Sequence, residues 1–396
     1  MRVVLYSTCF LPIPGGVQSN VFELARGLGE SRRDIASERI DVTVITRTEQ
    51  RTVQDSSWPF HLVRRPRLAQ LVRLLRDADV IHVAGPAMLP MALGLLFRKP
   101  VVVTHHNYQS VCPNGLLLLG TDRRICPGHF MAGHYRECFR CNSVDMGWLG
   151  SLRSLLLQFP RQWLCRLASV NVAITDHVRQ RVDLPRTETI LHGIRDPGCT
   201  PVVQNGDPVK IGYAGRLIQE KGLPVLLKAA KRLQDHGFTF TLTVVGDGPL
   251  RNELEQESRE LGLAGCTKFT GELAGADLER AVRPLRVLVM PSLSEETAGL
   301  AAIEQMMRGG VIVASDIGGL AEVVGDAGIK FTPGDSNELY ARLRELLEQP
   351  SALALLGGAA RERATAKFKL QTMINAYVAV YESLLRVAKP RRRRLP

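Results

Sequence analysis

Short apolar, β-branched runs alternate with stretches of helical periodicity along the whole chain. The runs are RVVLYS, DVTVITR, DVIHVA and PVVVTHH in the first half, and VKIGYAG, FTLTVVG, VLVMPS and GVIVAS in the second. Strands this apolar, separated by helices, are typical of parallel sheets that are covered on both faces. Two such sets in 396 residues predict an α/β protein with two doubly wound domains, because a single core rarely grows that large.

A cluster of Gly, Pro, Asn and Asp residues marks the predicted boundary between the two domains. It is the segment GCTPVVQNGDP, residues 198–208, between two periodic segments. We therefore predict an N-terminal Rossmann-like domain over residues 1–199 and a C-terminal Rossmann-like domain over residues 200–370. Apolar residues at helical spacing predict a further helix over residues 371–388, which packs either on its own domain or back on the first.

The composition indicates a globular enzyme without a membrane span. Its longest apolar stretch, AGPAMLPMALGLLF, stops at Arg98 and is shorter than the about 20 residues that cross a bilayer. The N-terminal MRVVLYSTCFLP fits a buried first strand better than a signal peptide, because no small-residue cleavage site follows. We expect a cytoplasmic protein.

Positive charge is concentrated in the first half and in the tail. Of the net charge of +12, residues 1–198 contribute 25 Lys and Arg against 16 Asp and Glu, and residues 389–396 form a basic tail. Such a surface suits a phosphorylated substrate or anionic lipid, or is a solvated surface without a partner. Nucleic acid is a disfavoured partner, because aromatic residues make up only 6% of the chain and the sequence contains no DNA- or RNA-binding motif. The stretch SLLLQFPRQWLCRL, residues 154–167, fits peripheral contact with the inner face of an anionic membrane or an ordinary core helix equally well.

Three loops with phosphate-binding chemistry follow strand-like runs. Pro14-Gly15-Gly16-Val17 lets backbone N–H groups approach an anion, and GRLIQEKG at 215–222 adds the cations Arg216 and Lys221. The third loop, EETAGLAAIE at 295–304, leads into a predicted helix N-terminus that attracts anions. In open α/β sheets, ligands bind at these carboxyl ends of the strands.

Together these loops resemble the retaining GT-B glycosyltransferases of family four, which transfer a sugar from a nucleotide diphosphate sugar. The resemblance covers nearly the whole chain in order and spacing. It implies two Rossmann-like domains that face a central cleft, with the acceptor bound by the first domain. The matching segments are GGV at 15–17, VVVTHHN at 101–107, GRLIQEKG at 215–222, VVGDGPL at 244–250, FTGEL at 269–273, PSLSEETAGLAAIEQM at 291–306 and ASDIGGLAEVV at 314–324.

The resemblance also implies roles for individual residues. Glu296 would hold hydroxyls of the donor sugar and Glu304 those of the ribose, about 12 Å apart if one continuous helix joins them. His106 matches a His near the donor sugar, whereas His105 would point elsewhere. The remaining implied contacts fall into two groups: the donor phosphates with Gly15, Gly16, Arg216, Lys221 and the backbone around Ala298, Gly299 and Leu300; and the acceptor side with Gln18 and Asn20.

The resemblance predicts a metal-independent, configuration-retaining hexosyltransferase-type enzyme. Cations and helix N–H groups would stabilise the leaving diphosphate without a catalytic cofactor. A nucleotide-sugar epimerase or hydrolase of the same fold, and an inactive nucleotide-sugar-binding protein, remain as alternatives. The acceptor, whether glycan, lipid-linked or small molecule, is not identified by the sequence.

A Cys-rich insert is predicted at residues 107–147. It contains Cys112, Cys126, Cys138 and Cys141, the last two as a CxxC pair of the kind that wraps a tetrahedral metal. A structural zinc site would stabilise an insert with only a modest core. An iron–sulfur cluster, disulfides and free thiols are the alternatives.

Overall fold

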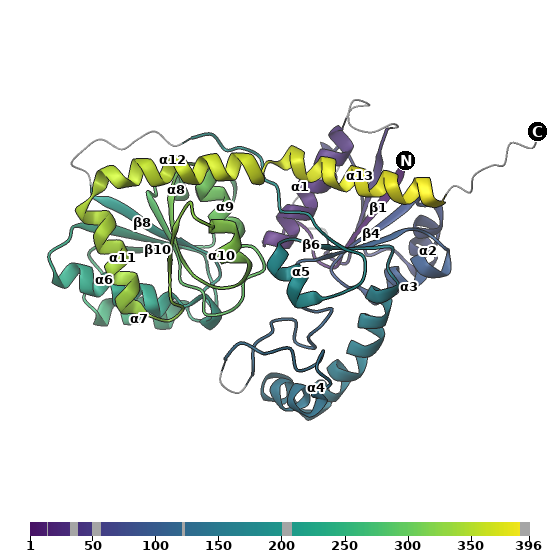
Figure 1. Ribbon diagram of the computed structural model, residues 1–396, viewed down its shortest axis with the longest axis horizontal. Coiled ribbons are helices and arrows are strands. Elements are labelled where there is room, and N and C mark those ends of the chain that lie inside the picture. Colours follow the sequence, from purple (N-terminus) through teal and green to yellow (C-terminus); the bar gives the residue numbers. More distant parts are fainter. Residues whose placement is uncertain (14, 32–38, 50–56, 121–122, 200–207, 389–396) are drawn as a thin grey trace, which may run out of the picture. The chain divides into compact units, whose positions relative to one another are not determined.

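The chain divides into two compact units (Figure 1), each described here by itself. Met1–Ile194 and Leu370–Pro396 form the first unit, and Arg195–Lys369 forms the second. The structure, a computed structural model, describes residues 1–13, 15–31, 39–49, 57–120, 123–199 and 208–388. Most of the predicted boundary segment and the basic tail therefore lie outside the described residues.

The first unit is a seven-stranded parallel sheet with helices on both faces. Its strand order is β3-β2-β1-β4-β5-β6-β7. The strands are β1 Arg2–Ser7, β2 Asp41–Thr46, β3 His61–Arg64, β4 Val80–Ala84, β5 Val101–His105, β6 Val170–Ala173 and β7 Thr187–Thr189. The helices are α1 Gly16–Glu30, α2 Leu68–Asp77, α3 Met88–Leu96, α4 Tyr135–Leu167, α5 Asp176–Val182 and α13 Leu370–Ala388.

The second unit repeats this architecture with six parallel strands. Its strand order is β10-β9-β8-β11-β12-β13. The strands are β8 Val209–Ala214, β9 Phe240–Val245, β10 Thr267–Gly271, β11 Val287–Met290, β12 Val311–Ser315 and β13 Ile329–Phe331. The helices are α6 Leu223–Asp235, α7 Arg251–Glu260, α8 Gly275–Val282, α9 Leu300–Met307, α10 Gly318–Val324, α11 Ser336–Glu348 and α12 Pro350–Lys367, and a short 3-10 turn covers Gln219–Lys221.

Strand order places a topological switch point in each sheet. The chain runs outward from β1 to β2 and β3, then returns to the other side of β1 with β4; β8 and β11 repeat this reversal in the second unit. Ligands of doubly wound sheets bind beside such a reversal, outside the carboxyl ends of the strands. The predicted fold class of two Rossmann-like units is confirmed, and the loops after β1, β8 and β11, which the sequence predicts to bind phosphate, all lie at a switch point.

Helix α13 belongs to the core of the first unit, which the sequence left open. Its residues Ile374, Tyr377 and Tyr381 are buried against α1 and the sheet. The Tyr381 hydroxyl shares a hydrogen bond of 2.7 Å with Nδ1 of His82, and Nε2 of His82 shares one of 2.7 Å with the Thr104 hydroxyl. Burial lowers the pKa of His82 to about 3, so the ring is neutral and both bonds need a fixed tautomer.

Replacing Tyr381 with Phe should therefore destabilise the first unit by about 1–3 kcal/mol, because the buried Nδ1 of His82 loses its partner. Denaturant unfolding of the full chain measures the change. Tyr135→Phe is the matched control, since Tyr135 is 41% exposed and should lose almost nothing. Equal stability of Tyr381→Phe and the wild type would contradict the assignment of this bond.

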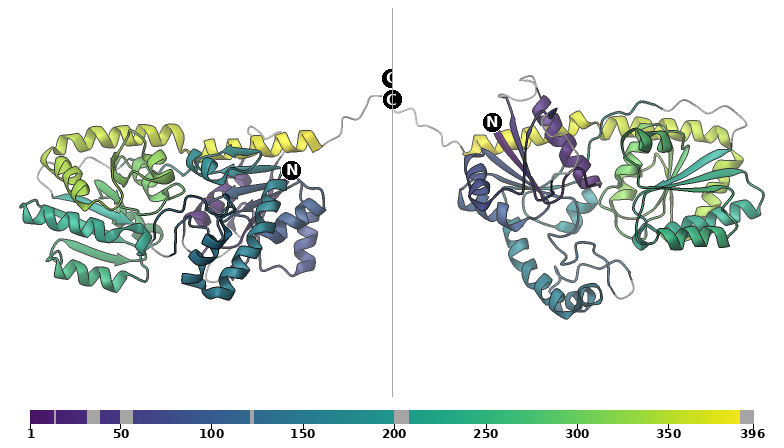
Figure 2. Two further views of the ribbon diagram at one scale, coloured as in Figure 1. Left: turned by 60° about the horizontal axis from the view of Figure 1, so that its bottom comes forward. Right: turned by 180° about the vertical axis from the view of Figure 1, so that it is seen from behind.

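Between β5 and helix α4 lie the irregular described segments 106–120 and 123–134. The helix bends at Gly147, whose φ of 66° and ψ of 175° are not helical, so residues 135–146 and 148–167 form two successive segments. Both ribbon views in Figure 2 place α4 along an edge of its unit. Of the helices in the described part of the chain, none combines the length and apolar character needed to cross a bilayer.

Candidate functional site

Two loops of the second unit meet at the carboxyl ends of β8 and β11. The N–H of Leu293 donates a hydrogen bond of 2.8 Å to the carbonyl of Glu220, which ties the β11 loop to the β8 loop. Gly222 lies beside this bond with a φ of 66°, and a Cβ there would be 2.0 Å from the carbonyl oxygen of Pro291. Only glycine permits this approach, so the segment GRLIQEKG ends at the position where the loops touch.

The loop contact brings Lys221 and Glu296 together. Lys221 Nζ lies 2.9 Å from a carboxylate oxygen of Glu296, with the two side chains 23% and 10% exposed. Ser292 also donates a hydrogen bond to this carboxylate. Burial alone would raise the pKa of Glu296, but Lys221, Ser292 and Arg216 together lower it below its ordinary value. Glu296 is therefore an ionised hydrogen-bond acceptor at neutral pH.

Arg216 is held at the backbone and exposed at the side chain. The buried Tyr213 hydroxyl donates a hydrogen bond of 2.7 Å to the Arg216 carbonyl. Burial first, and then the charge of Glu296, raise the pKa of Tyr213, so its hydroxyl stays protonated as a donor. With its backbone fixed and its guanidinium exposed, Arg216 adds a second cation to the loop that carries Lys221.

Helix α9 begins directly after the acidic loop. Its N-cap is Gly299, with a φ of 88° and no side-chain cap, and Leu300 is its first residue. The first backbone N–H groups of a helix have no intrahelical partner and attract anions. Ala298 is buried beside them. A helix N-terminus is thus present where the sequence predicts it, and its binding of phosphate stays a prediction.

The predicted continuous helix from Glu296 to Glu304 is wrong. Glu296 precedes α9, and its carbonyl accepts a hydrogen bond of 2.7 Å from the N–H of Gly319 at the start of α10. A Cβ on Gly318 would lie 2.8 Å from the same carbonyl, so the two glycines of ASDIGGLAEVV let α10 support the loop. The estimate of about 12 Å along one helix therefore does not apply to the two carboxylates.

Glu304 differs from Glu296 in its environment. It lies within α9, where burial raises its pKa, the nearby Arg308 lowers it and Glu279 raises it further. Arg308 itself forms an ion pair of 2.5 Å with Glu279. Because Arg308 is already paired, Glu304 lacks the strong cation that ionises Glu296. Its predicted role at the ribose hydroxyls stays a prediction.

The first unit has an open cavity of about 810 Å³ beside its own switch point. Residues after β1, β2, β4 and β5 line it, including Gln18 and His106. The described lining residues include Arg47, Arg65 and Arg161 and no acidic side chain. Arg65 pairs with Glu49, whereas Arg161 donates a hydrogen bond of 2.7 Å to the neutral Gln158. The cavity is therefore basic.

His106 is a buried, neutral imidazole at the wall of this cavity. Its Nδ1 lies 3.2 Å from Nε2 of His192, and burial followed by the charges of His192, His82 and His105 keeps its pKa well below the ordinary value. It can therefore form neutral hydrogen bonds but carries no positive charge near pH 7. His105 points elsewhere, as expected: its Nε2 lies 2.9 Å from Oδ1 of Asn171.

The other residues predicted near the first strand separate into two kinds. Gly15 is the N-cap of α1 and Gly16 its first residue, so both lie at a helix N-terminus, and Gln18 lines the cavity. Asn20 does not reach the cavity. It is buried, and its amide donates to the sulfur of Met373 in α13 at 3.3 Å. Its polar side chain fastens α13, and the acceptor-side role of Asn20 stays a prediction.

The four cysteines of the insert come close together as thiols. Burial first, and then the proximity of Cys112, Cys126 and Cys141, raise the pKa of Cys138 to about 12. All eight cysteines of the chain lie in the described part, and each is a free thiol. The disulfide alternative is therefore not realised in this structure.

The thiols do not form a metal-binding arrangement. Cys138 and Cys141 lie in the first segment of α4 rather than in a knuckle, and the Cys141 thiol donates to the Leu118 carbonyl at 3.3 Å while accepting from the Gly120 N–H at 3.1 Å. Among the described residues, no group of three or more His, Cys, Asp or Glu side chains is placed to hold a metal ion. Zinc at this cluster stays a prediction, and elemental analysis of protein purified without chelator should find close to one zinc per chain if it is right.

Sequence reasoning missed several residues that complete the site. Ser292 bonds Glu296, His192 contacts His106, and Gly318 supports the acidic loop. The sequence contains a signal for two of these residues. Ser292 lies four residues before Glu296, and the glycine pair of ASDIGGLAEVV, which includes Gly318, indicates a close approach between backbone segments. The contact of His192 depends on tertiary structure alone.

Both units match models of known families. Residues 14–194 match the model described as "Glycosyltransferase Family 4", and residues 208–349 match "Glycosyl transferases group 1". The 2-deoxystreptamine glucosyltransferase of Streptomyces kanamyceticus is 35% identical over 46% of this chain, and a glycogen synthase of Mycobacterium tuberculosis is 31% identical over 63%. The matched segments span 47% and 63% of the length of these two relatives.

Solved structures show the same fold. HepE of Anabaena, in complex with UDP-glucose, has a TM-score of 0.69 at 19% identity and covers 97% of this chain and 99% of its own. Sucrose-phosphate synthase of Thermosynechococcus elongatus has a TM-score of 0.71 at 20% identity, over 98% of this chain and 99% of its own. Since one family model matches each unit in order, the chain belongs to family 4, group 1, of the glycosyltransferases with the GT-B fold.

Proposed function

We propose that the protein transfers a glycosyl group from a nucleotide diphosphate sugar to an acceptor, with retention of the anomeric configuration and without a catalytic metal. The observation that carries the proposal is the ionised Glu296, held by Lys221 and Ser292 beside the N-terminus of α9. A site that presents cations, free helix N–H groups and one carboxylate offers separate partners for the diphosphate and for sugar hydroxyls.

The chemistry requires stabilisation of the leaving group. Breaking the bond between the anomeric carbon and the phosphate oxygen leaves negative charge on the nucleoside diphosphate. Arg216, Lys221 and the N–H groups of α9 are fixed before that charge develops, so they stabilise the transition state more than the ground state. Glu296 accepts hydrogen bonds from the donor sugar and orients it.

In the first unit, His106 would hydrogen-bond a hydroxyl of the donor sugar as a neutral imidazole, and its contact with His192 selects the tautomer. The basic cavity next to it favours an acceptor that carries an anionic group. Arg161 supports this, because it lines the cavity and its hydrogen-bond partner Gln158 is neutral.

The test is turnover with a panel of nucleotide diphosphate sugars and acceptors, read by mass spectrometry and by the anomeric coupling constants in the product. The panel should pair neutral acceptors with phosphorylated counterparts. A glycosylated acceptor with the donor's anomeric configuration supports the proposal. Epimerised donor, or free sugar as the sole product, would favour an epimerase or hydrolase, and donor binding without any product would favour an inactive binding protein.

We expect EDTA to leave transfer with a saturating donor largely unchanged over minutes. Lys221 and Arg216 would supply to the diphosphate the positive charge that a divalent ion would otherwise provide. Initial rates with and without chelator measure this. Immediate loss of activity that magnesium or manganese restores would contradict metal independence.

A further inference from the structure

The second segment of α4, after Gly147, buries polar side chains and exposes most of its large apolar ones. Ser151 and Gln158 are fully buried, whereas Trp148, Leu156 and Trp163 are 63%, 59% and 60% exposed. Helices of water-soluble domains normally show the opposite arrangement. This helix segment therefore exposes the side chains that a core would cover.

The apolar residues follow helical spacing and form one continuous surface. Over 20 residues at 1.5 Å per residue, this surface is about 30 Å long. We name it the outer face of α4. Its members are Trp148, Leu149, Leu152, Leu156, Phe159, Trp163 and Leu167.

Hydrogen bonds fix the rotation of the helix that exposes this face. The Ser151 hydroxyl donates to the carbonyl of Phe139 at 2.6 Å, and the Ser154 hydroxyl donates to the carbonyl of Pro113 at 3.0 Å. Gln158 accepts from Arg161 on the same inner side. Turning the apolar side inward would break these bonds, so the outward apolar face is a property of the folded unit.

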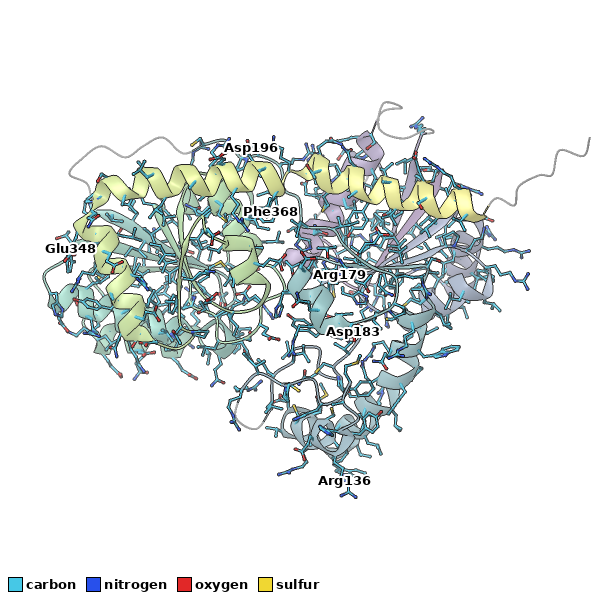
Figure 3. All side chains as sticks on the ribbon, in the orientation of Figure 1. Arg136, Arg179, Asp183, Asp196, Glu348 and Phe368 are labelled. Carbon is cyan, nitrogen blue, oxygen red and sulfur yellow. The ribbon has the colours of Figure 1, made fainter. Side chains whose placement is uncertain are left out.

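Charge along the segment has a single sign. Residues 146–167 contain three arginines and no Asp or Glu, and Arg153 and Arg166 are exposed beside the outer face. Arg136, at the start of α4, is also exposed and points away from the unit in Figure 3. An apolar strip flanked only by cations is complementary to a surface that is apolar beneath a layer of negative charge.

We propose that the outer face of α4 binds the surface of an anionic lipid bilayer. The side chains of Trp148, Leu156 and Trp163 enter the boundary between headgroups and acyl chains, where the amphipathic indole ring is favoured. Arg153 and Arg166 contact lipid phosphates. A bilayer fits this surface better than a protein groove does, because the exposed apolar side chains extend along a single helix segment and are flanked only by arginines.

The proposal stands independently of the proposed function, because none of the residues on the outer face contacts the candidate site. Its test is flotation of the full chain with vesicles of phosphatidylcholine containing phosphatidylglycerol. We expect binding at low salt, and at least about tenfold less with phosphatidylcholine alone, since each arginine near an anionic surface contributes roughly a further fivefold.

Two variants separate the apolar and the ionic contributions. Trp148→Glu with Trp163→Glu should abolish flotation, and Arg153→Glu with Arg166→Glu should lower it at low salt. Leu355→Glu is the matched control: Leu355 is 79% exposed on α12 in the second unit, and the substitution should leave binding unchanged. Because all these positions are exposed, far-UV circular dichroism and thermal unfolding should stay as in the wild type.

Intrinsic fluorescence supplies a second readout. The chain has three tryptophans, and Trp58 packs against Phe10, Phe22 and Phe60 while the other two lie on the outer face. Vesicles containing phosphatidylglycerol should shift the emission to shorter wavelength, and brominated lipids should quench it. With Trp148 and Trp163 both replaced by Glu, neither change should occur.

Three outcomes would overturn the proposal. The first is no flotation at low salt. The second is equal flotation of the wild type and the Trp148→Glu, Trp163→Glu variant, which would assign lipid binding to another surface. The third is concentration-dependent self-association of the wild type in sedimentation velocity, lost in that variant without any lipid binding, which would make the outer face an interface between two copies of the chain.

Discussion

Replacement of Lys221 by Met is expected to lower kcat/KM for glycosyl transfer at least about a hundredfold, the effect of removing one preorganised electrostatic donor. Lys221 is the cation nearest to Glu296, at 2.9 Å, and lies on the loop that meets the start of the acidic segment. The variant loses charge that stabilises the leaving diphosphate and also leaves the Glu296 carboxylate without its main cation. Initial rates at several donor concentrations measure both effects.

Lys231→Met is the matched control for this substitution. Lys231 lies in α6 of the same unit and forms an ion pair with the exposed Asp235, so its removal should change neither kcat/KM nor stability by a measurable amount. Wild-type activity in Lys221→Met would contradict the role of Lys221. A loss of activity in both variants would point instead to general sensitivity of the unit to lost positive charge.

The same ion pair gives a pH dependence of known sign. Because the pKa of Glu296 is lowered in the folded state, its ionisation stabilises the fold above the unfolded pKa and this contribution is lost as the pH falls through the folded value. In Lys221→Met, the charge of Lys221 no longer counteracts the effect of burial, so the pKa of Glu296 rises. The stability difference between the two proteins should therefore be largest near neutral pH and shrink in acid.

Most central strands could be predicted from sequence, whereas the central strand β6, Val170–Ala173, and the edge strands are not among the predicted runs. Strands such as β1 and β5 are buried on both faces and read as unbroken apolar runs. The edge strands β7, Thr187–Thr189, and β13, Ile329–Phe331, have three residues each and are partly exposed. They take their conformation from the neighbouring strand, so no local pattern distinguishes them from loops.

The candidate site could be predicted where one short segment supplies several groups. Arg216 and Lys221 share one loop, and Glu296 lies just before the helix N-terminus that the sequence indicates. The contact of Asn20 with Met373 could not be predicted, because only tertiary structure brings the two residues together. Contacts between distant segments leave no periodicity in the sequence.

Helix α4 shows the same limit of periodicity. The apolar and Arg residues of the stretch 154–167 fit a core helix and a membrane-facing helix equally well. The periodicity predicts that apolar side chains lie along one side of the helix, but it does not identify what contacts them. The exposure of Trp163 and the burial of Gln158 argue against an ordinary core helix, because a core helix would bury the first and expose the second.

Replacement of Gly222 by Ala is expected to separate the two loops of the donor site. Gly222 has a φ of 66°, and the added Cβ would lie 2.0 Å from the backbone carbonyl oxygen of Pro291. A backbone atom cannot move aside as a side chain can, so the segments that carry Lys221 and Glu296 must shift relative to each other. A misplacement of about 1 Å is enough to lower the turnover rate roughly a hundredfold.

Gly237, at the other end of α6, separates steric clash from backbone strain. It has a φ of 79°, but a Cβ there would meet no atom within 4 Å. Gly237→Ala should therefore cost only the about 1–2 kcal/mol of a left-handed alanine and leave kcat/KM unchanged, whereas Gly222→Ala should cost more stability and lose activity at a temperature where it is folded. Thermal unfolding and initial rates of both variants test this. Because the two glycines share the sign of φ and flank the same helix, equal effects would show that the contact between Gly222 and Pro291 does not hold the site together.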